Sequence, residues 1–270
     1  MLPPELVQRA RGLADGTLQA ASVRDAATVV LLRDAAGGPE VYLLRRVRAM
    51  AFAAGMHVFP GGSVDRADAQ AHVRWSGPDP AQWASWLGAD EPLARALVCA
   101  AVRETFEESG VLLAGPSEDA LLADVSSDEW EAERVALEAR EQTLSQLLER
   151  RGLVLRSDLL RPFAHWITPE VEPKRFDTRF FLAQLPAGQV CRDAGGEADS
   201  RVWVRPRIAL EQQLTMLAPT AVSLGELADL ADVASALARQ WPISPVLPKI
   251  VVRRDDSVAM LLPGDPDYPS

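Results

Sequence analysis

Short apolar runs separated by turn residues recur along this chain, and longer periodic segments lie between them. The runs are rich in Val, Leu and Phe, a composition that favours strands. Two of them, residues 27–33 and 41–46, flank an Ala-Gly-Gly-Pro turn and predict a pair of strands. Further strands are predicted at residues 57–59, 175–183 and 202–204, and a hairpin at 250–252 and 258–262 around a turn at 255–257.

The periodic segments predict helices. Residues 94–109 contain neither Gly nor Pro and are followed by Gly110, at the position of a C-cap glycine. Residues 130–151 place five aliphatic side chains at helical spacing, which fits a lid, a dimer contact in a homodimer, or a helix packed on the core. Other helices are predicted at residues 5–20, 79–87, 208–216 and 223–240.

One face of the helix predicted at 94–109 carries an unusual cluster of charge. Glu104, Glu107 and Glu108 fall on one arc, whereas the opposite arc is mostly apolar. Like charges at this spacing destabilise an isolated helix, so the face is either solvated or neutralised by a cation. The segments 100–102 and 111–113 on both flanks are apolar and read as buried. Crowded carboxylates beside a core favour Mg²⁺ or Mn²⁺.

A second stretch, residues 59–65, has the sequence Phe-Pro-Gly-Gly-Ser-Val-Asp and precedes the helix. Paired glycines after a strand allow close approach of the backbone to a ligand, and their N–H groups can line an anion site. Together the two stretches resemble the Nudix box, with Gly62 opening it and residues 103–111 closing it. Thr105 takes a bulky apolar position of that pattern and Asp68 stands where the family has Glu. The gap between Asp68 and Arg103 holds 34 residues instead of 7.

Shorter pieces resemble one branch of this family, the coenzyme A diphosphatases with an insert inside the box. They are Leu-Leu-Arg-Arg at residues 43–46, the segment 55–62, Trp-Ile-Thr-Pro at 166–169, Lys-Arg-Phe-Asp-Thr-Arg-Phe-Phe at 174–181, and Pro-Gly-Asp-Pro at 263–266. The resemblance implies hydrolysis of coenzyme A or acyl-coenzyme A to 3′,5′-ADP and a 4′-phosphopantetheine product.

The resemblance also assigns site residues. It implies that Glu104, Glu107 and Glu108 hold Mg²⁺ or Mn²⁺, with Glu197 as a further metal ligand from a loop. Arg103 is expected to pair with a carboxylate and fix its rotamer. Glu104 is the first candidate for the general base, and Glu197 and Glu172 are loop alternatives.

Substrate binding is expected at the glycine pair and at two cation pairs. Gly61 and Gly62 shape the loop against which a diphosphate would lie. Arg45 with Arg46, and Lys174 with Arg175, are candidate partners of a second phosphate group, because paired cations are locally unusual in an acidic protein. A solvated loop is the alternative for Lys174 and Arg175.

The net charge of −10 argues against nucleic acid as a bulk partner, so the expected partner is a small nucleoside-diphosphate substrate. Cys99 and Cys191 are the only cysteines and suggest neither a disulfide framework nor a zinc site. No apolar run is long enough for a bilayer and the first 20 residues lack the apolar segment of a secretory signal, so a cytoplasmic protein without membrane contact is expected.

The predicted fold class is α/β (α+β), a Nudix α/β/α sandwich with a mixed sheet in a single domain, 1–270. It has an insert within the box at 69–91, a helical insertion at 117–160, and C-terminal helices with a hairpin at 205–270. The insert contains Trp75, Trp83 and Trp86, which are expected to form a satellite core instead of stacking on an adenine.

Two other functions fit the same residues. A Nudix enzyme acting on ADP-ribose, NADH or a nucleotide sugar would share the box and differ in its pocket. The other class is a non-catalytic Nudix-like sensor or scaffold that binds a nucleotide, and such domains commonly lose glutamates of the box. All three helix glutamates are present here, which favours an enzyme.

Overall fold

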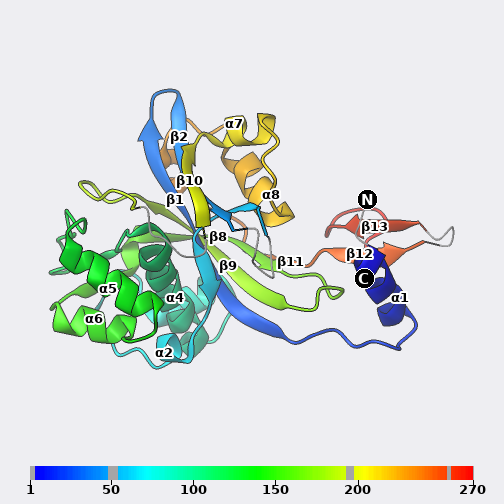
Figure 1. The fold of residues 1–270 in the computed structure, drawn as a ribbon, viewed down its shortest axis with the longest axis horizontal. Helices are drawn as coiled ribbons and strands as arrows, with labels where there is room; N and C mark the ends of the chain where they lie inside the picture. Colours follow the sequence, from blue (N-terminus) through cyan, green and yellow to red (C-terminus); the bar gives the residue numbers. More distant parts are fainter. Residues whose placement is uncertain (1–3, 48–53, 193–197, 254–256, 270) are drawn as a thin grey trace.

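The computed structural model describes residues 4–47, 54–192, 198–253 and 257–269, and its centre is a mixed β-sheet (Figure 1). The sheet has the order β10-β2-β1-β9-β8-β11, and the short strands β3 and β4 pair with β2 and β1. β1 and β9 run parallel, whereas β1 with β2 and β8 with β9 run antiparallel. The bounds are β1 Val23–Ala35, β2 Gly38–Arg46, β3 His57–Val58, β4 Gly61–Ser63, β8 Leu160–Ile167, β9 Arg175–Gln184, β10 Ala198–Val204 and β11 Pro245–Val246.

The central strand β1 is apolar on both faces, which explains why helices cover both sides of the sheet. Val29 and Leu31 belong to the core shared with helix α4 (Glu91–Ser109), and Val30 and Leu32 belong to a second core on the other face. That second core packs against α7 (Pro206–Glu211), α8 (Ala218–Leu227) and α9 (Val233–Ala238). The predicted three-layer arrangement with a mixed sheet is therefore confirmed.

Helix α4 is fixed at both ends by local sequence. The Asp90 carboxylate accepts a hydrogen bond from the Leu93 N–H at 2.8 Å, and the helix ends at Gly110 with φ 73°. The helix thus begins three residues before the predicted start. Its apolar arc, including Val98, Val102 and Phe106, is fully buried against the sheet.

The insert packs on α4. It follows α2 (Arg66–Ala69) and contains β5 (Trp75–Ser76) and α3 (Pro80–Leu87). Strand β5 joins β6 (Ala114–Gly115) and β7 (Val154–Arg156) in a small second sheet. Trp83 is fully buried, with its ring 5.1 Å from that of Trp86 and 5.7 Å from that of Phe181. The insert therefore extends the main core.

Two predicted helices are each divided in the structure. The segment predicted as one helix at 130–151 forms α5 (Asp128–Glu138) and α6 (Leu144–Arg150), because the backbone turns at Arg140, φ 60°, and Thr143 caps α6. The segment 223–240 is shared between α8 and α9, and Asp232 caps the latter. The 3-10 helix Ser157–Leu159 follows β7.

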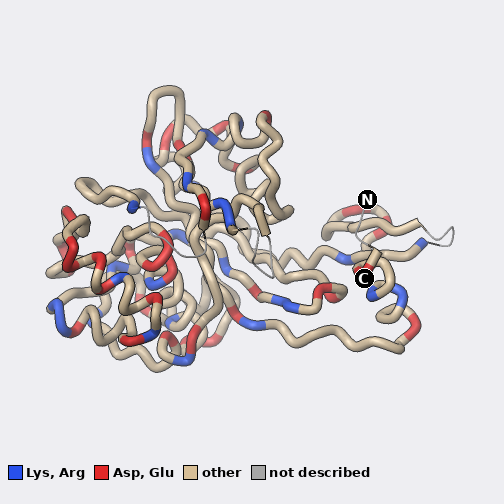
Figure 2. Tube along the Cα trace, in the orientation of Figure 1, with Lys and Arg blue, Asp and Glu red and all other residues tan. Residues whose placement is uncertain are grey.

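The two ends of the chain meet beside each other. Helix α1 (Pro4–Ala14) contacts the hairpin of β12 (Lys249–Val252) and β13 (Val258–Leu261), away from α4 to α6 (Figure 1). The hairpin strands were predicted, whereas part of their turn lies outside the described residues. Acidic and basic residues are interspersed over α4 to α6 (Figure 2). No helix in the described part of the chain is long and apolar enough to cross a membrane.

Burial of the Trp83 ring predicts a stability role for the insert. Trp83→Ala is expected to lower the free energy of unfolding by about 3 kcal/mol or more, because it leaves a cavity between α3, α4 and β9. Trp86→Ala, at a ring that is 38% exposed, is the matched control and should cost clearly less. Urea unfolding followed by circular dichroism measures both. Equal losses for the two variants would contradict this packing role.

Candidate active site

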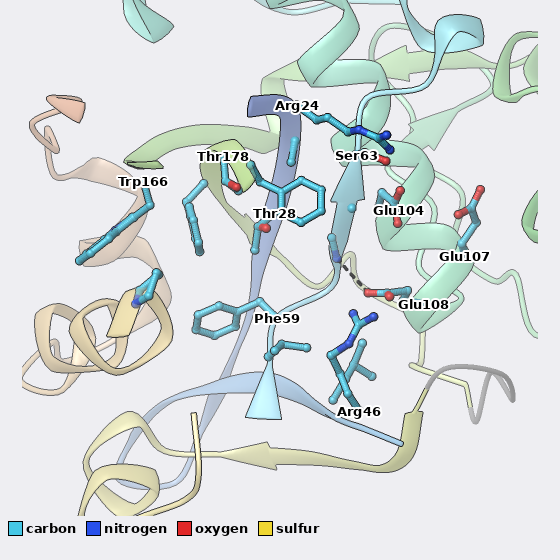
Figure 3. Close-up of a pocket in the computed structure, with 18 of the residues that line it drawn as sticks. Arg24, Thr28, Arg46, Phe59, Ser63, Glu104, Glu107, Glu108, Trp166 and Thr178 are labelled. Carbon is cyan, nitrogen blue, oxygen red and sulfur yellow. Dashed lines mark hydrogen bonds between the residues drawn. The ribbon is translucent and has the colours of Figure 1, made fainter. Parts of the chain in front are cut away.

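The glycine pair and the glutamate arc meet at the wall of one large cavity. Strand β4 pairs with β1 at Gly61 and Gly62; the Gly61 N–H reaches Glu108, and Gly62 lies against Glu104. Glu104, Glu107 and Glu108 lie together beside this strand (Figure 3). The cavity has a volume of about 920 Å³. Glu104, Glu107 and Glu108 all line it.

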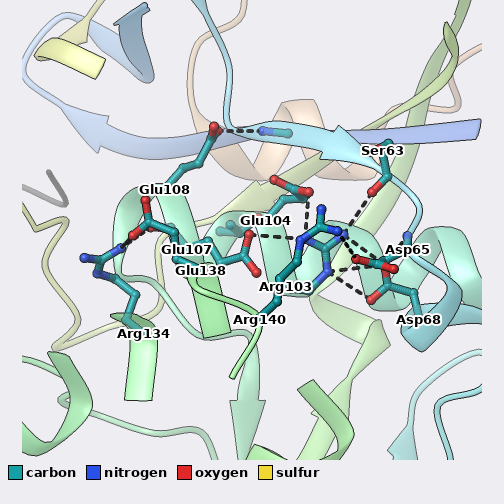
Figure 4. A network of polar contacts seen from close by, with 12 residues as sticks. Ser63, Asp65, Asp68, Arg103, Glu104, Glu107, Glu108, Arg134, Glu138 and Arg140 are labelled. Carbon is teal, nitrogen blue, oxygen red and sulfur yellow. Dashed lines mark hydrogen bonds and ion pairs between the residues drawn. The ribbon is translucent and has the colours of Figure 1, made fainter. Parts of the chain in front are cut away.

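Arg103 is the centre of a carboxylate network (Figure 4). Its guanidinium donates to Asp68 at 2.8 and 3.0 Å, to Glu104 at 2.7 Å and to Glu107 at 3.2 Å. It also donates to the Ser63 carbonyl at 3.0 Å. Arg103 is 8% exposed and Asp68 2%, so this network lies out of water. Arg103 therefore takes the carboxylate-pairing position that the sequence predicted, and Asp68 is its main partner.

Burial and mutual repulsion disturb the ionisation of this network. The pKa of Glu107 is raised to about 7, mainly because burial disfavours its charged form, and the nearby Glu104 charge adds to the effect. The charge of Arg103 acts in the opposite direction. Burial alone would lower the pKa of Arg103, but its hydrogen bond to Asp68 and the surrounding carboxylates raise it above its ordinary value. Arg103 alone does not supply enough positive charge to keep Glu107 fully ionised at neutral pH.

The glycines hold the other two glutamates by close approach. The Gly61 N–H donates to Glu108 at 2.8 Å. At Gly62 a Cβ would lie 2.4 Å from the Glu104 Oε1, so any side chain there would displace the Glu104 carboxylate. Glycine at position 62 thus leaves the Glu104 carboxylate where it stands.

In each of the two predicted cation pairs, one side chain lines the cavity and the other does not. Arg46 and Lys174 line the cavity. Arg45 does not; it points to the other side of β2 and pairs with Asp199 at 2.6 Å. Arg175 is also outside the lining and donates to the carbonyls of Thr168 and Ala21 at 3.0 and 2.8 Å. Only one member of each pair is therefore placed to meet a ligand.

Several cavity residues were missed by sequence reasoning. Arg24 lies on β1, which begins earlier than predicted, and Arg201 lies on β10. Glu138 and Arg140 come from the end of α5, a turn that the sequence analysis placed inside a helix. The alternation of Arg24, Ala26 and Thr28 on one face of β1 was the available signal for the first of these.

An apolar wall completes the cavity on the side away from the glutamates, where Phe59 and Trp166 lie (Figure 3). Phe176, Phe180, Pro248 and Met260 also belong to the lining. The loop candidate Glu172 lines the cavity as well, and burial raises its pKa. Glu197, the predicted metal ligand from a loop, lies outside the described residues.

Comparisons with known proteins agree with this geometry. The family model described as the NUDT19 Nudix domain matches residues 80–222, more than half of the chain. This chain belongs to the Nudix hydrolase family. Two relatives named acyl-coenzyme A diphosphatase NUDT19 are similar to it. The Gallus gallus protein is 28% identical, over 91% of this chain and 80% of the relative. The Xenopus laevis protein is 26% identical, over 85% of this chain and 71% of the relative.

A solved structure supports the same family. The crystal structure of a Nudix hydrolase from Alicyclobacillus acidocaldarius is 31% identical, has a TM-score of 0.69, and covers 83% of this chain and 99% of its own. The fold class predicted from sequence, with α4 as the Nudix helix, is thereby confirmed. The chain is a Nudix hydrolase in which α2, β5 and α3 lie between the glycine strand β4 and that helix.

Nudix hydrolases generally use divalent metal ions, and the residues of this site fit such an ion. The donors are all carboxylate oxygens, as Mg²⁺ and Mn²⁺ prefer. In the described part of the chain, no three acidic, His or Cys side chains are arranged to hold a metal ion, and Glu104 and Glu107 accept hydrogen bonds from Arg103. A cation would nevertheless favour the charged form of Glu107, whose pKa is raised mainly by burial and in part by the Glu104 charge.

The close contact at Gly62 predicts different outcomes for the two glycines. Gly62→Ala should displace the flexible Glu104 carboxylate and lower kcat by at least about tenfold with little loss of thermal stability. Gly61→Ala should instead lower Tm, since its Cβ would lie 2.6 Å from the carbonyl oxygen of Ala27. Turnover and thermal unfolding should be measured on both. A Gly62→Ala enzyme with wild-type kcat would show that Glu104 is not needed where it stands.

Proposed function

We propose that this Nudix hydrolase cleaves the diphosphate of coenzyme A or acyl-coenzyme A to 3′,5′-ADP and (acyl-)4′-phosphopantetheine. The observation that carries the proposal is the cavity itself, in which cations flank the glutamates. Figure 3 shows Arg24 and Arg46 on opposite sides of Glu104 and Glu108. Coenzyme A has a 3′-phosphate as well as its diphosphate, so it needs a cation beyond those that meet the diphosphate. The names of the two similar vertebrate proteins support this substrate class.

The proposed roles follow from the contacts of each residue. Glu104, Glu107 and Glu108 would hold Mg²⁺ or Mn²⁺, which supplies charge neutralisation at the diphosphate and lowers the pKa of bound water. Arg103 sets the positions of Glu104 and Glu107 through its hydrogen bonds. Glu104 is the proposed general base, because it is a cavity carboxylate fixed between Arg103 and Gly62.

Lys174 and Arg46 are the proposed partners of the phosphates. Lys174 lies over the Phe176 ring, with its ammonium nitrogen 5.3 Å from the ring centroid, so its position in the cavity wall is defined. Arg46 carries a planar fork suited to a phosphate. The apolar wall around Trp166 leaves room for the uncharged remainder of the substrate.

A substrate comparison tests this proposal. Coenzyme A, octanoyl-coenzyme A, 3′-dephospho-coenzyme A, ADP-ribose and NADH should be offered with Mg²⁺ or Mn²⁺, and the products identified by mass. Coenzyme A species are expected to have the highest kcat/KM, and Glu108→Gln should lower kcat by about a hundredfold or more. Faster cleavage of ADP-ribose or NADH would contradict the substrate assignment and leave a Nudix hydrolase of that other class. No cleavage of any diphosphate would favour a nucleotide sensor.

The 3′-phosphate contact has its own matched variants. Lys174→Met or Arg46→Met should raise KM for coenzyme A by about ten- to a hundredfold, because each removes one charge-assisted contact with phosphate. The same variants should raise KM for 3′-dephospho-coenzyme A much less, because that substrate lacks the 3′-phosphate. Arg45→Met, which removes only the ion pair with Asp199, is the neighbouring control and should leave both constants near wild type. Equal effects on both substrates in the Lys174 and Arg46 variants would rule out these residues as the 3′-phosphate site.

A further inference from the structure

The end of helix α5 has an unexpected residue at its turn. The Arg140 N–H donates to the Leu137 carbonyl at 2.9 Å and the Glu141 N–H to the Ala136 carbonyl at 2.8 Å, which closes the helix with Arg140 in the left-handed conformation, φ 60°. A helix end of this type strongly favours glycine, because only glycine adopts this conformation without steric cost.

Other helices of this chain follow that rule. The left-handed residue is Gly88 after α3, with φ 60°, Gly110 after α4, with φ 73°, and Gly152 after α6, with φ 66°. Only Arg140 and Gln213 are non-glycine residues with positive φ among the described ranges. The steric cost of the left-handed conformation at Arg140 is consistent with a functional role for its side chain, beyond stabilising the fold.

The Arg140 side chain lines the active-site cavity. The turn that joins α5 to α6, residues 139–143, contributes Arg140, Gln142 and Thr143 to the lining. The guanidinium is 76% exposed and pairs with Asp65 at 3.2 Å, next to the network of Arg103 (Figure 4). An exposed ion pair of this kind adds little stability, so Arg140 can exchange Asp65 for a stronger partner at small cost.

The turn is held firmly against the Nudix helix. The buried Arg134 donates to the main-chain carbonyl of Glu107 at 2.8 Å and to the carboxylate of Glu138 at 2.7 Å. The position of Arg140 is therefore tied to the same helix turn that carries the proposed metal ligands.

We propose that Arg140 is a further substrate-binding residue, whose guanidinium leaves Asp65 to bind an oxygen of the substrate diphosphate. A guanidinium forms stronger, paired hydrogen bonds with phosphate than with an exposed carboxylate. The cation also compensates for the surrounding carboxylates in a chain of net charge −10. The proposal rests on the proposed diphosphate hydrolysis, and it assigns a role in binding to the helical insertion.

The test uses variants that separate charge from backbone strain. Arg140→Asn removes the charge but tolerates the left-handed conformation, and Arg140→Gly also removes the strain. Gln213→Gly, at the other left-handed position, φ 53°, lies outside the cavity lining and is the control. The first measurements are Tm, and kcat and KM for coenzyme A. The last is the Kd of α,β-methylene-ADP in the absence of metal; this diphosphate analogue cannot be hydrolysed at its methylene bridge.

The proposal predicts that Arg140→Asn lowers kcat/KM and weakens α,β-methylene-ADP binding by about tenfold or more. Arg140→Gly should show the same loss while its Tm rises by about 2–4 °C, and Gln213→Gly should gain Tm without a change in kcat/KM. Wild-type kcat/KM and Kd in Arg140→Asn would overturn the proposal, as would a lower Tm in Arg140→Gly, which would show a structural role. If the wild-type protein hydrolyses no diphosphate, the proposed function fails, and the analogue Kd still decides whether Arg140 binds a diphosphate.

Discussion

The buried guanidinium of Arg103 is the contact on which the site depends. Three carboxylates from two elements, Asp68 of α2 and Glu104 and Glu107 of α4, share this one cation. Removing Arg103 would leave the buried carboxylate of Asp68 without its counterion, a change that typically costs several kcal/mol. Even with Arg103 beside it, burial and the Glu104 charge raise the pKa of Glu107 to about 7. The proposed divalent cation would bind at this group of carboxylates.

The fold offsets the repulsion between these carboxylates because α4 is anchored independently of its charged face. Its apolar arc is buried against β1, and Asp90 and Gly110 fix its two ends. The insert lengthens the connection between Asp68 and Arg103, yet it packs Trp83 into the same core, and Arg103 still donates to Asp68 at 2.8 Å. A long insertion is tolerated when its own side chains bury enough apolar surface to offset the ordering of its chain.

Local patterns predicted the parts of the site that depend on one element. The 3.6-residue period placed Glu104, Glu107 and Glu108 on one arc, and the glycine pair indicated a close backbone approach. Contacts between distant segments carry no such pattern. Asp68 could be aligned with the family glutamate but not assigned to Arg103, and the choice of Arg46 over Arg45 depends on which face of β2 meets the cavity. The helix break at Arg140 was missed because arginine gives no stop signal.

Direct measurement of Mn²⁺ binding tests the central claim, that the carboxylates around Arg103 form a divalent cation site. Free Mn²⁺ can be followed by electron paramagnetic resonance during titration of the wild-type protein and of Glu104→Gln. Because the pKa of Glu107 is raised to about 7, its carboxylate is mostly ionised at pH 8 and mostly protonated at pH 6, where the proton competes with the metal. The account predicts saturable binding at pH 8 that is about tenfold weaker at pH 6 and greatly weakened in Glu104→Gln. Absence of saturable binding at pH 8, or equal binding by both proteins, would contradict it.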